Sequence, residues 1–114
     1  ESAFRQFVAS LCRGAGWDVL AVHDGAAGLD AASTGSFDLI LLDMTLPDLP
    51  GIDVLTKISS SRRAPVIVIS GRADDLEFAR ARLAGAFACL PKPIRAARLL
   101  EALSRAVRVR PNSG

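Results

Sequence analysis

Two runs of four apolar residues, Leu39–Leu42 and Val66–Ile69, constrain the fold of this chain most strongly. Neither run alternates with polar residues, and both are short. Such runs are typical of parallel strands that are buried on both faces of a sheet. Around them apolar residues recur at spacings of three and four, which is typical of amphipathic helices. This alternation predicts an α/β fold, a doubly wound parallel sheet with helices on both faces.

The punctuation of the sequence predicts five helices and four strands that alternate, beginning and ending with a helix. The expected strands are residues 18–22, 39–42, 66–69 and 86–90. Asp24 and Asp74 are expected to cap the second and fourth helices, with Glu77 completing a capping box. The third helix is expected over Ile52–Ile58. The first helix carries the apolar positions Phe4, Phe7, Val8, Leu11 and Cys12.

The last helix is expected to begin near Pro93, because proline fits the first turn of a helix. Its apolar seam is expected at Ile94, Ala97, Leu100, Leu103 and Val107. Five arginines and one glutamate lie among the final twenty residues of the chain. No aromatic or lysine-rich pattern accompanies these arginines, so a solvated helix face is favoured over nucleic-acid binding.

The length of 114 residues fits one domain, expected over residues 1–110, with 111–114 as a polar tail or linker. The two cysteines, Cys12 and Cys89, are far apart and His23 is the one histidine, which excludes a disulfide scaffold and an ordinary Cys/His zinc site. No apolar run is long enough to cross a bilayer and no signal peptide pattern is present. The sequence predicts a cytoplasmic domain that makes no membrane contact.

Polar residues follow three of the expected strands: Asp43, Ser70 and Lys92. Because the carboxyl ends of parallel strands meet at one edge of the sheet, we expect these side chains to converge. A carboxylate, a hydroxyl and an ammonium group together suit capture of a phosphoryl group. Asp43 is then the nucleophile, Ser70 a hydrogen-bond donor and Lys92 a cation that neutralises developing charge.

Three segments resemble the receiver domain of response regulators in two-component signalling. They are residues 38–47 with Gly51, residues 66–71, and residues 85–93. The resemblance implies a flavodoxin-like (βα)5 fold with strand order 2-1-3-4-5. It implies that Asp43 is the phospho-acceptor, Ser70 the switch hydroxyl and Lys92 the phosphate-pairing cation.

The same resemblance implies further roles around the acceptor. The backbone carbonyl of Thr45 would bind Mg²⁺ together with Asp43. Thr45 and Arg72 would occupy positions that tune the lifetime of the acyl phosphate, and the peptide bond before Pro93 would be cis. The implied partners are a sensor histidine kinase or phosphotransfer protein and a second copy of the chain.

The chain departs from the family pattern in two places. Cys89 stands where the family usually has an aromatic switch residue, so output coupling is expected to rely on the loop after Ser70 and on the fourth helix. Glu1–Phe4 resembles the residues just after the family's first strand and its acidic, Mg²⁺-binding pair. We therefore expect that strand and pair to be missing upstream of Glu1, which leaves a groove beside residues 18–22 and an incomplete Mg²⁺ site. A later start of the given sequence, strand swapping and a rearranged, degenerate sheet all explain this.

Three classes of function follow from these patterns. The first is a receiver that takes a phosphoryl group on Asp43 and signals by conformational change, without being an enzyme in its own right. The second is a pseudo-receiver that serves as a phosphorylation-independent interaction or dimerisation module. A small-ligand or catalytic role is weaker, because the chain has no phosphate-binding glycine loop and Ser70 has no nearby histidine. His23 follows a strand and is expected to be a solvated or capping residue rather than a phosphoryl donor.

Overall fold

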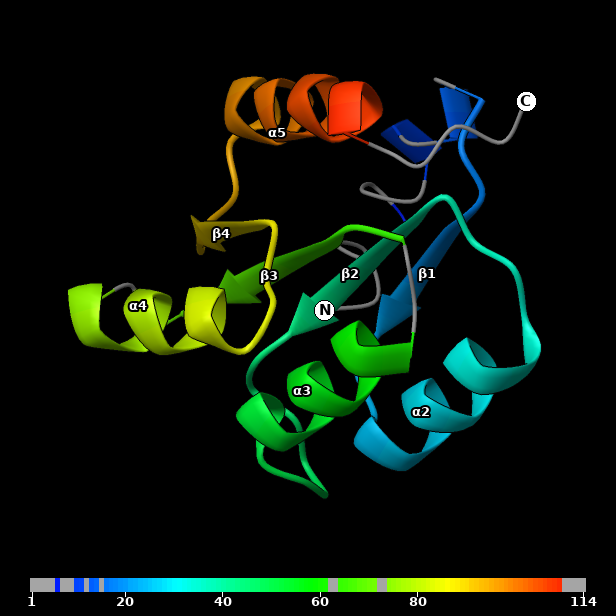
Figure 1. The fold of residues 1–114 in the computed structure, drawn as a ribbon. Coiled ribbons are helices and arrows are strands. Elements are labelled where there is room, and N and C mark those ends of the chain that lie inside the picture. The colour runs from blue at the N-terminus through cyan, green and yellow to red at the C-terminus, as the bar shows by residue number, and fades with distance from the viewer. Residues whose placement is uncertain are drawn as a thin grey trace.

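A four-stranded parallel sheet forms the centre of the structure, a computed structural model that describes residues 16–61, 64–71 and 74–109 together with Gln6, Ser10, Leu11, Arg13 and Gly14. The strands lie side by side in chain order (Figure 1). They are β1 (Val19–Val22), β2 (Leu39–Asp43), β3 (Val66–Ser70) and β4 (Ala88–Pro91). The expected doubly wound α/β fold is confirmed.

Helices cover both faces of this sheet (Figure 1). They are α2 (Gly25–Thr34), α3 (Gly51–Ser61), α4 (Asp75–Leu83) and α5 (Ala96–Val109). Asp24 caps α2 by accepting a hydrogen bond from Ala27 N, as its sequence position predicts. Of the apolar positions expected in the first helix, Leu11 is described and packs against the core beneath α5, while the others lie outside the described residues.

The core consists of two hydrophobic clusters, one on each face of the sheet. In β2, Leu39 and Leu41 face the α5 side, whereas Ile40 and Leu42 face α2 and α3. All four side chains are at most 3% exposed. The unbroken apolar run is therefore explained by burial on both faces, and the run in β3 divides between the clusters in the same way.

The groove expected beside residues 18–22 is absent from the described sheet, so that prediction is wrong. β1 pairs directly with β2, from Val19 opposite Leu39 to Val22 opposite Leu42. The order is β1-β2-β3-β4, which equals the family order 2-1-3-4-5 with its first strand removed and the remaining strands drawn together. Direct pairing satisfies backbone groups that an open slot would leave without partners.

Two aspartates fix how β1 and β2 begin. The backbone N–H of Asp38 donates to the carbonyl oxygen of Asp18 at 2.8 Å. In return, the carboxylate Oδ2 of Asp38 accepts from the backbone N–H of Asp18, also at 2.8 Å. The two strands therefore start from a reciprocal pair of hydrogen bonds.

The last helix differs from its expected form in start and in phase. Pro93 does not lie in its first turn, because α5 begins at Ala96. The expected seam is also partly wrong: Leu103 is buried, but Ala97 and Leu100 are exposed. The buried positions are Leu99, Ala102, Leu103 and Ala106. Both stripes have helical spacing, and the observed one places two small alanines against the sheet, so that the helix can lie close to it.

Gly28 of α2 is expected to resist substitution, because a Cβ there would lie 2.3 Å from Cγ1 of Val22. Valine is stiff and cannot move aside as a long side chain would. Alanine gains about 1 kcal/mol of helix propensity, whereas overpacking costs about 1–3 kcal/mol. We expect Gly28→Ala to lower the free energy of unfolding in a urea titration.

A second substitution separates this clash from a general effect of alanine. Combined with Val22→Ala, Gly28→Ala should cost less than it does alone, because the clashing methyl groups are gone. Gly14→Ala is the control, since its added Cβ meets nothing within 4 Å. Strictly additive effects at positions 22 and 28 would contradict the packing argument.

Candidate functional site

The sheet brings the ends of three strands to one edge. Asp43 is the last residue of β2, Ser70 is the last residue of β3, and Lys92 directly follows β4. Backbone hydrogen bonds join these ends, from Met44 N to Ile69 O and from Lys92 N to Ser70 O, each at 2.9 Å. The parallel register thus places all three residues at the carboxyl edge that the sequence predicts.

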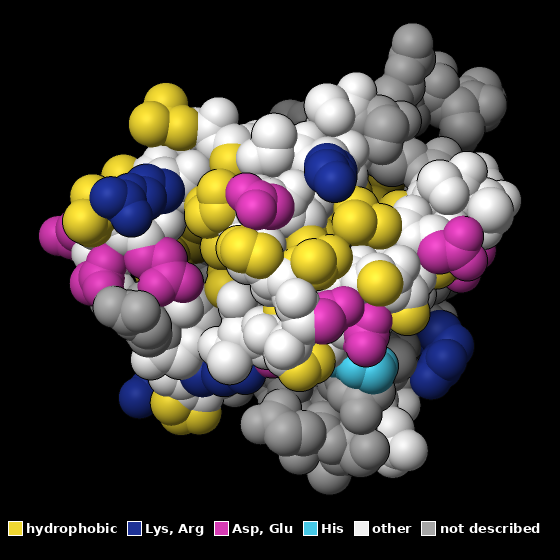
Figure 2. Space-filling model, turned by 90° about the horizontal axis from the view of Figure 1, so that it is seen from below, with side chains coloured by type: hydrophobic (Ala, Val, Ile, Leu, Met, Phe, Trp, Pro, Cys, Tyr) yellow, Lys and Arg dark blue, Asp and Glu magenta, His cyan; other side chains and the backbone are white. Residues whose placement is uncertain are grey.

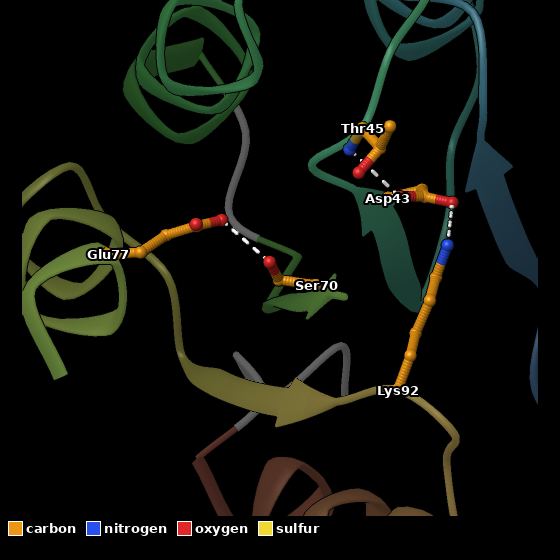
Figure 3. Close-up of polar contacts among 5 residues, drawn as sticks. All are labelled: Asp43, Thr45, Ser70, Glu77 and Lys92. Atoms are coloured by element: carbon orange, nitrogen blue, oxygen red, sulfur yellow. Dashed lines mark hydrogen bonds and ion pairs between the residues drawn. The ribbon is translucent and has the colours of Figure 1, made fainter. Parts of the chain in front are cut away.

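Asp43 and Lys92 contact each other directly. Lys92 Nζ lies 2.7 Å from Asp43 Oδ2, and the backbone N–H of Thr45 donates to Asp43 Oδ1 at 2.9 Å (Figure 3). The Asp43 and Lys92 side chains are 19% and 25% exposed. The carboxylate is therefore held in one orientation and still reachable from solvent, which a reacting group requires.

Ser70 lies at the same edge but its hydroxyl is engaged elsewhere. It donates a hydrogen bond of 2.7 Å to Oε2 of Glu77, in the first turn of α4. Figure 3 shows the Ser70 side chain pointing toward Glu77 rather than toward the Asp43–Lys92 pair. Ser70 is 1% exposed and Glu77 is half-buried, so this contact is partly shielded from water.

Sequence reasoning predicted Glu77 as a capping-box residue and missed its contact with Ser70. The predicted role of Asp74 as the N-cap of α4 is confirmed, because Asp74 Oδ1 accepts from the backbone N–H of Glu77 at 2.7 Å. The sequence signal for the contact with Ser70 is the spacing: a glutamate in the first turn of the next helix lies seven residues after a strand-end serine.

Cys89 lies beside this contact rather than within the Asp43–Lys92 pair. Its Sγ lies 3.8 Å from the carbonyl oxygen of Phe78 in α4. Burial raises the pKa of the Cys89 thiol, which disfavours a reactive thiolate. The peptide bond between Lys92 and Pro93 is cis, as the resemblance implies. Arg72 lies outside the described residues.

The described residues do not by themselves fit a magnesium site. Mg²⁺ prefers several oxygen ligands in octahedral geometry. Within the part of the chain that the structure describes, no three His, Cys, Asp or Glu residues are grouped to hold a metal ion. Asp43 supplies one carboxylate, both of whose oxygens already accept hydrogen bonds. With the Thr45 carbonyl added, the set still falls short of what the ion requires.

Asp48, in the loop that follows Asp43, ties this loop to helix α2. Its Oδ1 accepts from Gly25 N at 2.8 Å and its Oδ2 from Ala26 N at 2.9 Å. These backbone N–H groups, Ala26 first, lower the pKa of the Asp48 carboxyl from its ordinary value of 3.8. The exposed carboxylate also lies at the positive end of the helix dipole.

The lowered pKa predicts how Asp48 contributes to stability at different pH values. A depressed folded-state pKa stabilises the fold above about pH 3.8, and this contribution is lost as pH falls through the folded-state pKa. We therefore expect Asp48→Asn to lower the urea midpoint at neutral pH and to have a smaller effect in acid. Asp30→Asn, at an exposed position in α2, is the control. An Asp48→Asn effect that does not change with pH would contradict the charge argument.

The surface beside the site mixes apolar and acidic side chains, as the face in Figure 2 shows. A groove with a volume of about 260 Å³ runs between the start of α3 and α4. Its lining includes Met44, which directly follows Asp43, and Glu77, the partner of Ser70. His23 and the described arginines Arg95, Arg98 and Arg105 are exposed, as a solvated role predicts. No helix among the described residues is long and apolar enough to span a membrane.

Comparisons with known proteins agree with this geometry. A family model of the response regulator receiver domain matches residues 1–104. The chain is 40% identical over 93 residues to the transcriptional regulatory protein KdpE of Mycobacterium tuberculosis, covering 82% of this chain and 41% of that protein. The chain thus spans less than half the length of this relative.

Solved structures show the same likeness. A CheY-like receiver domain from Methanospirillum hungatei superposes with a TM-score of 0.85 at 26% identity, covering 95% of this chain and 87% of that one. The receiver domain of the sensor histidine kinase PA1611 from Pseudomonas aeruginosa, with a magnesium ion in its active site cleft, gives 0.78 at 27% identity, covering 95% and 91%. The chain belongs to the response regulator receiver domain family.

Proposed function

We propose that this receiver domain accepts a phosphoryl group on Asp43 from a phosphohistidine of a sensor histidine kinase or phosphotransfer protein. Receiver domains are signalling domains that interact with histidine kinases. The observation that carries the proposal is the Asp43–Lys92 pair at the carboxyl edge of the sheet, in which the carboxylate is oriented and accessible. Signalling then follows from a changed surface around the acceptor.

The residues present account for the chemistry of transfer. A carboxylate oxygen of Asp43 forms the new bond to phosphorus, the donor P–N bond breaks, and its electron pair returns to the imidazole nitrogen. Phosphoryl transfer depends mainly on positioning and on neutralising charge. Thr45 N–H holds the orientation of Asp43, and the Lys92 ammonium compensates the additional negative charge of the acyl phosphate.

Magnesium enters this proposal as a group that needs further ligands. When bound, it would neutralise charge on the phosphoryl oxygens. Asp43 and the Thr45 carbonyl are the ligands that this chain's described residues would contribute. Further carboxylates are needed to complete the site, and the assay of phosphoryl uptake therefore compares conditions with and without Mg²⁺.

Incubation with acetyl phosphate tests the proposal. Intact-protein mass spectrometry is expected to show one added phosphoryl group that hydroxylamine removes, as an acyl phosphate requires. The assay is run on this chain and on a longer chain that includes the residues encoded before Glu1. Uptake by either chain supports the proposal. No uptake by either would overturn it and favour a phosphorylation-independent interaction module.

A further inference from the structure

The contact between Ser70 and Glu77 links the acceptor edge to helix α4. The Ser70 hydroxyl has a single proton, which it donates to Glu77 Oε2. The role that the sequence predicts for Ser70 requires that the same proton be donated to a phosphoryl oxygen on Asp43. The two hydrogen bonds therefore compete, and Ser70 cannot fully serve both acceptors.

Helix α4 buries little of its own surface, which makes this contact important. Its buried residue is the small Ala81, whereas Leu76 and Leu83 are 61% and 90% exposed. At the end of α4, Ser59 Oγ donates to the carbonyl oxygen of Ala84 at 2.7 Å. At its start, the Ser70–Glu77 bond holds the first turn. Hydrogen bonds to charged groups are stronger than neutral ones, so loss of this bond should loosen that turn.

The residue three positions before Lys92 also contacts α4. Cys89 stands there, and its Sγ contacts the carbonyl oxygen of Phe78, the residue after Glu77. A thiol of this size cannot transmit the steric change of a moving aromatic ring. Glu77, in contrast, contacts the hydroxyl at the acceptor edge and also lines the groove beside Met44.

We propose that Glu77 is a positioning residue that holds the Ser70 hydroxyl away from Asp43 in the unmodified protein and frees the first turn of α4 when the phosphoryl group takes over that hydrogen bond. This inference rests on the proposed phosphoryl acceptance. Glu77 therefore opposes phosphorylation and at the same time transmits it, because release of Ser70 and release of α4 are the same event.

A double-mutant cycle with beryllofluoride, which mimics a bound phosphoryl group, tests the proposal. The cycle comprises wild type, Ser70→Ala, Glu77→Ala and the double variant, in the longest chain that takes up the mimic. Affinity is measured by fluorine NMR. We expect Glu77→Ala to tighten beryllofluoride binding on the order of tenfold, since the competing acceptor is gone. In the Ser70→Ala background, Glu77→Ala should have no effect on affinity.

Asp75→Ala is the matched control. Asp75 is an exposed acidic residue in the same helical turn, so its removal changes the charge near the helix terminus without touching Ser70. It should leave beryllofluoride affinity unchanged. Hydrogen exchange of the α4 amides provides a second measurement. Beryllofluoride should accelerate exchange in wild type, whereas Glu77→Ala should exchange rapidly with and without it.

Failure of the two proposals can be told apart. If wild type binds beryllofluoride but Glu77→Ala binds it equally or more weakly, the role of Glu77 is overturned and phosphoryl acceptance stands. An equal gain for Glu77→Ala in the Ser70→Ala background also overturns it, because the effect would not pass through the hydroxyl. Absence of binding in every variant overturns both.

Discussion

Asp43→Asn is expected to reduce phosphoryl uptake from acetyl phosphate to background. Asparagine matches aspartate in size, and its amide oxygen can still accept from Thr45 N–H. It lacks the anionic oxygen that attacks phosphorus, and it removes the negative partner of Lys92. Because that ion pair is partly exposed, the free energy of unfolding should change by no more than about 1 kcal/mol. Loss of uptake with retained stability would assign the effect to chemistry.

Asp53→Asn provides the comparison for this loss. Asp53 is an exposed carboxylate in the first turn of α3 and is not part of the Asp43–Lys92 pair. Its substitution should leave both the rate and the extent of uptake unchanged. Continued uptake by Asp43→Asn, with the added group mapped to another carboxylate, would show that the acceptor has been misassigned.

Leu39→Ala is expected to have the largest effect on stability. Leu39 is 0% exposed in β2 and belongs to the cluster beneath α5. Removing a buried leucine side chain costs about 2–5 kcal/mol, from lost burial and from the cavity left behind. A domain of this size is stable by about 5–15 kcal/mol in total. Urea unfolding monitored by far-ultraviolet circular dichroism should show a much lower midpoint with an unchanged slope.

The same substitution at Leu83 isolates the contribution of burial. Leu83 is 90% exposed at the end of α4, and Leu83→Ala should change the free energy of unfolding by no more than about 0.5 kcal/mol. Similar losses at the two positions would mean that the sheet core does not determine stability as its packing implies.

The sheet was predictable because its strands are short, apolar and clearly bounded. The strands β2 and β3 coincide with the expected strands to within one residue. Because both faces are buried, each apolar run is uninterrupted and its bounds can be read from the sequence. The α5 seam was not predictable in the same way. The sequence carries two overlapping stripes of helical spacing, and the choice between them depends on contact with the sheet.

In the candidate site, too, one contact was predictable from the sequence and another was not. Asp43 and Lys92 were expected to meet because parallel strands place their carboxyl ends together, and the 2.7 Å contact follows from that register. Glu77 could not be assigned to Ser70 in advance, because its partner depends on how α4 approaches the sheet. A rearranged sheet was one of the alternatives that the sequence left open, and the pairing of β1 with β2 could not be chosen over the others in advance, because strand order depends on which neighbours are available.

The reciprocal bonds between Asp18 and Asp38 have a consequence for the fidelity of the site. A strand with one polar face resists sliding, since a shift by one residue would expose its apolar side chains. β2 is apolar on both faces, so a shift by one residue would still bury apolar side chains on each face, and burial alone does not fix its register. Such a shift would turn the Asp43 carboxylate to the opposite side of the sheet, out of reach of Lys92. The hydrogen bonds between the two aspartates, at the amino ends of β1 and β2, therefore fix the register of these strands and so the position of the Asp43–Lys92 ion pair at the opposite end.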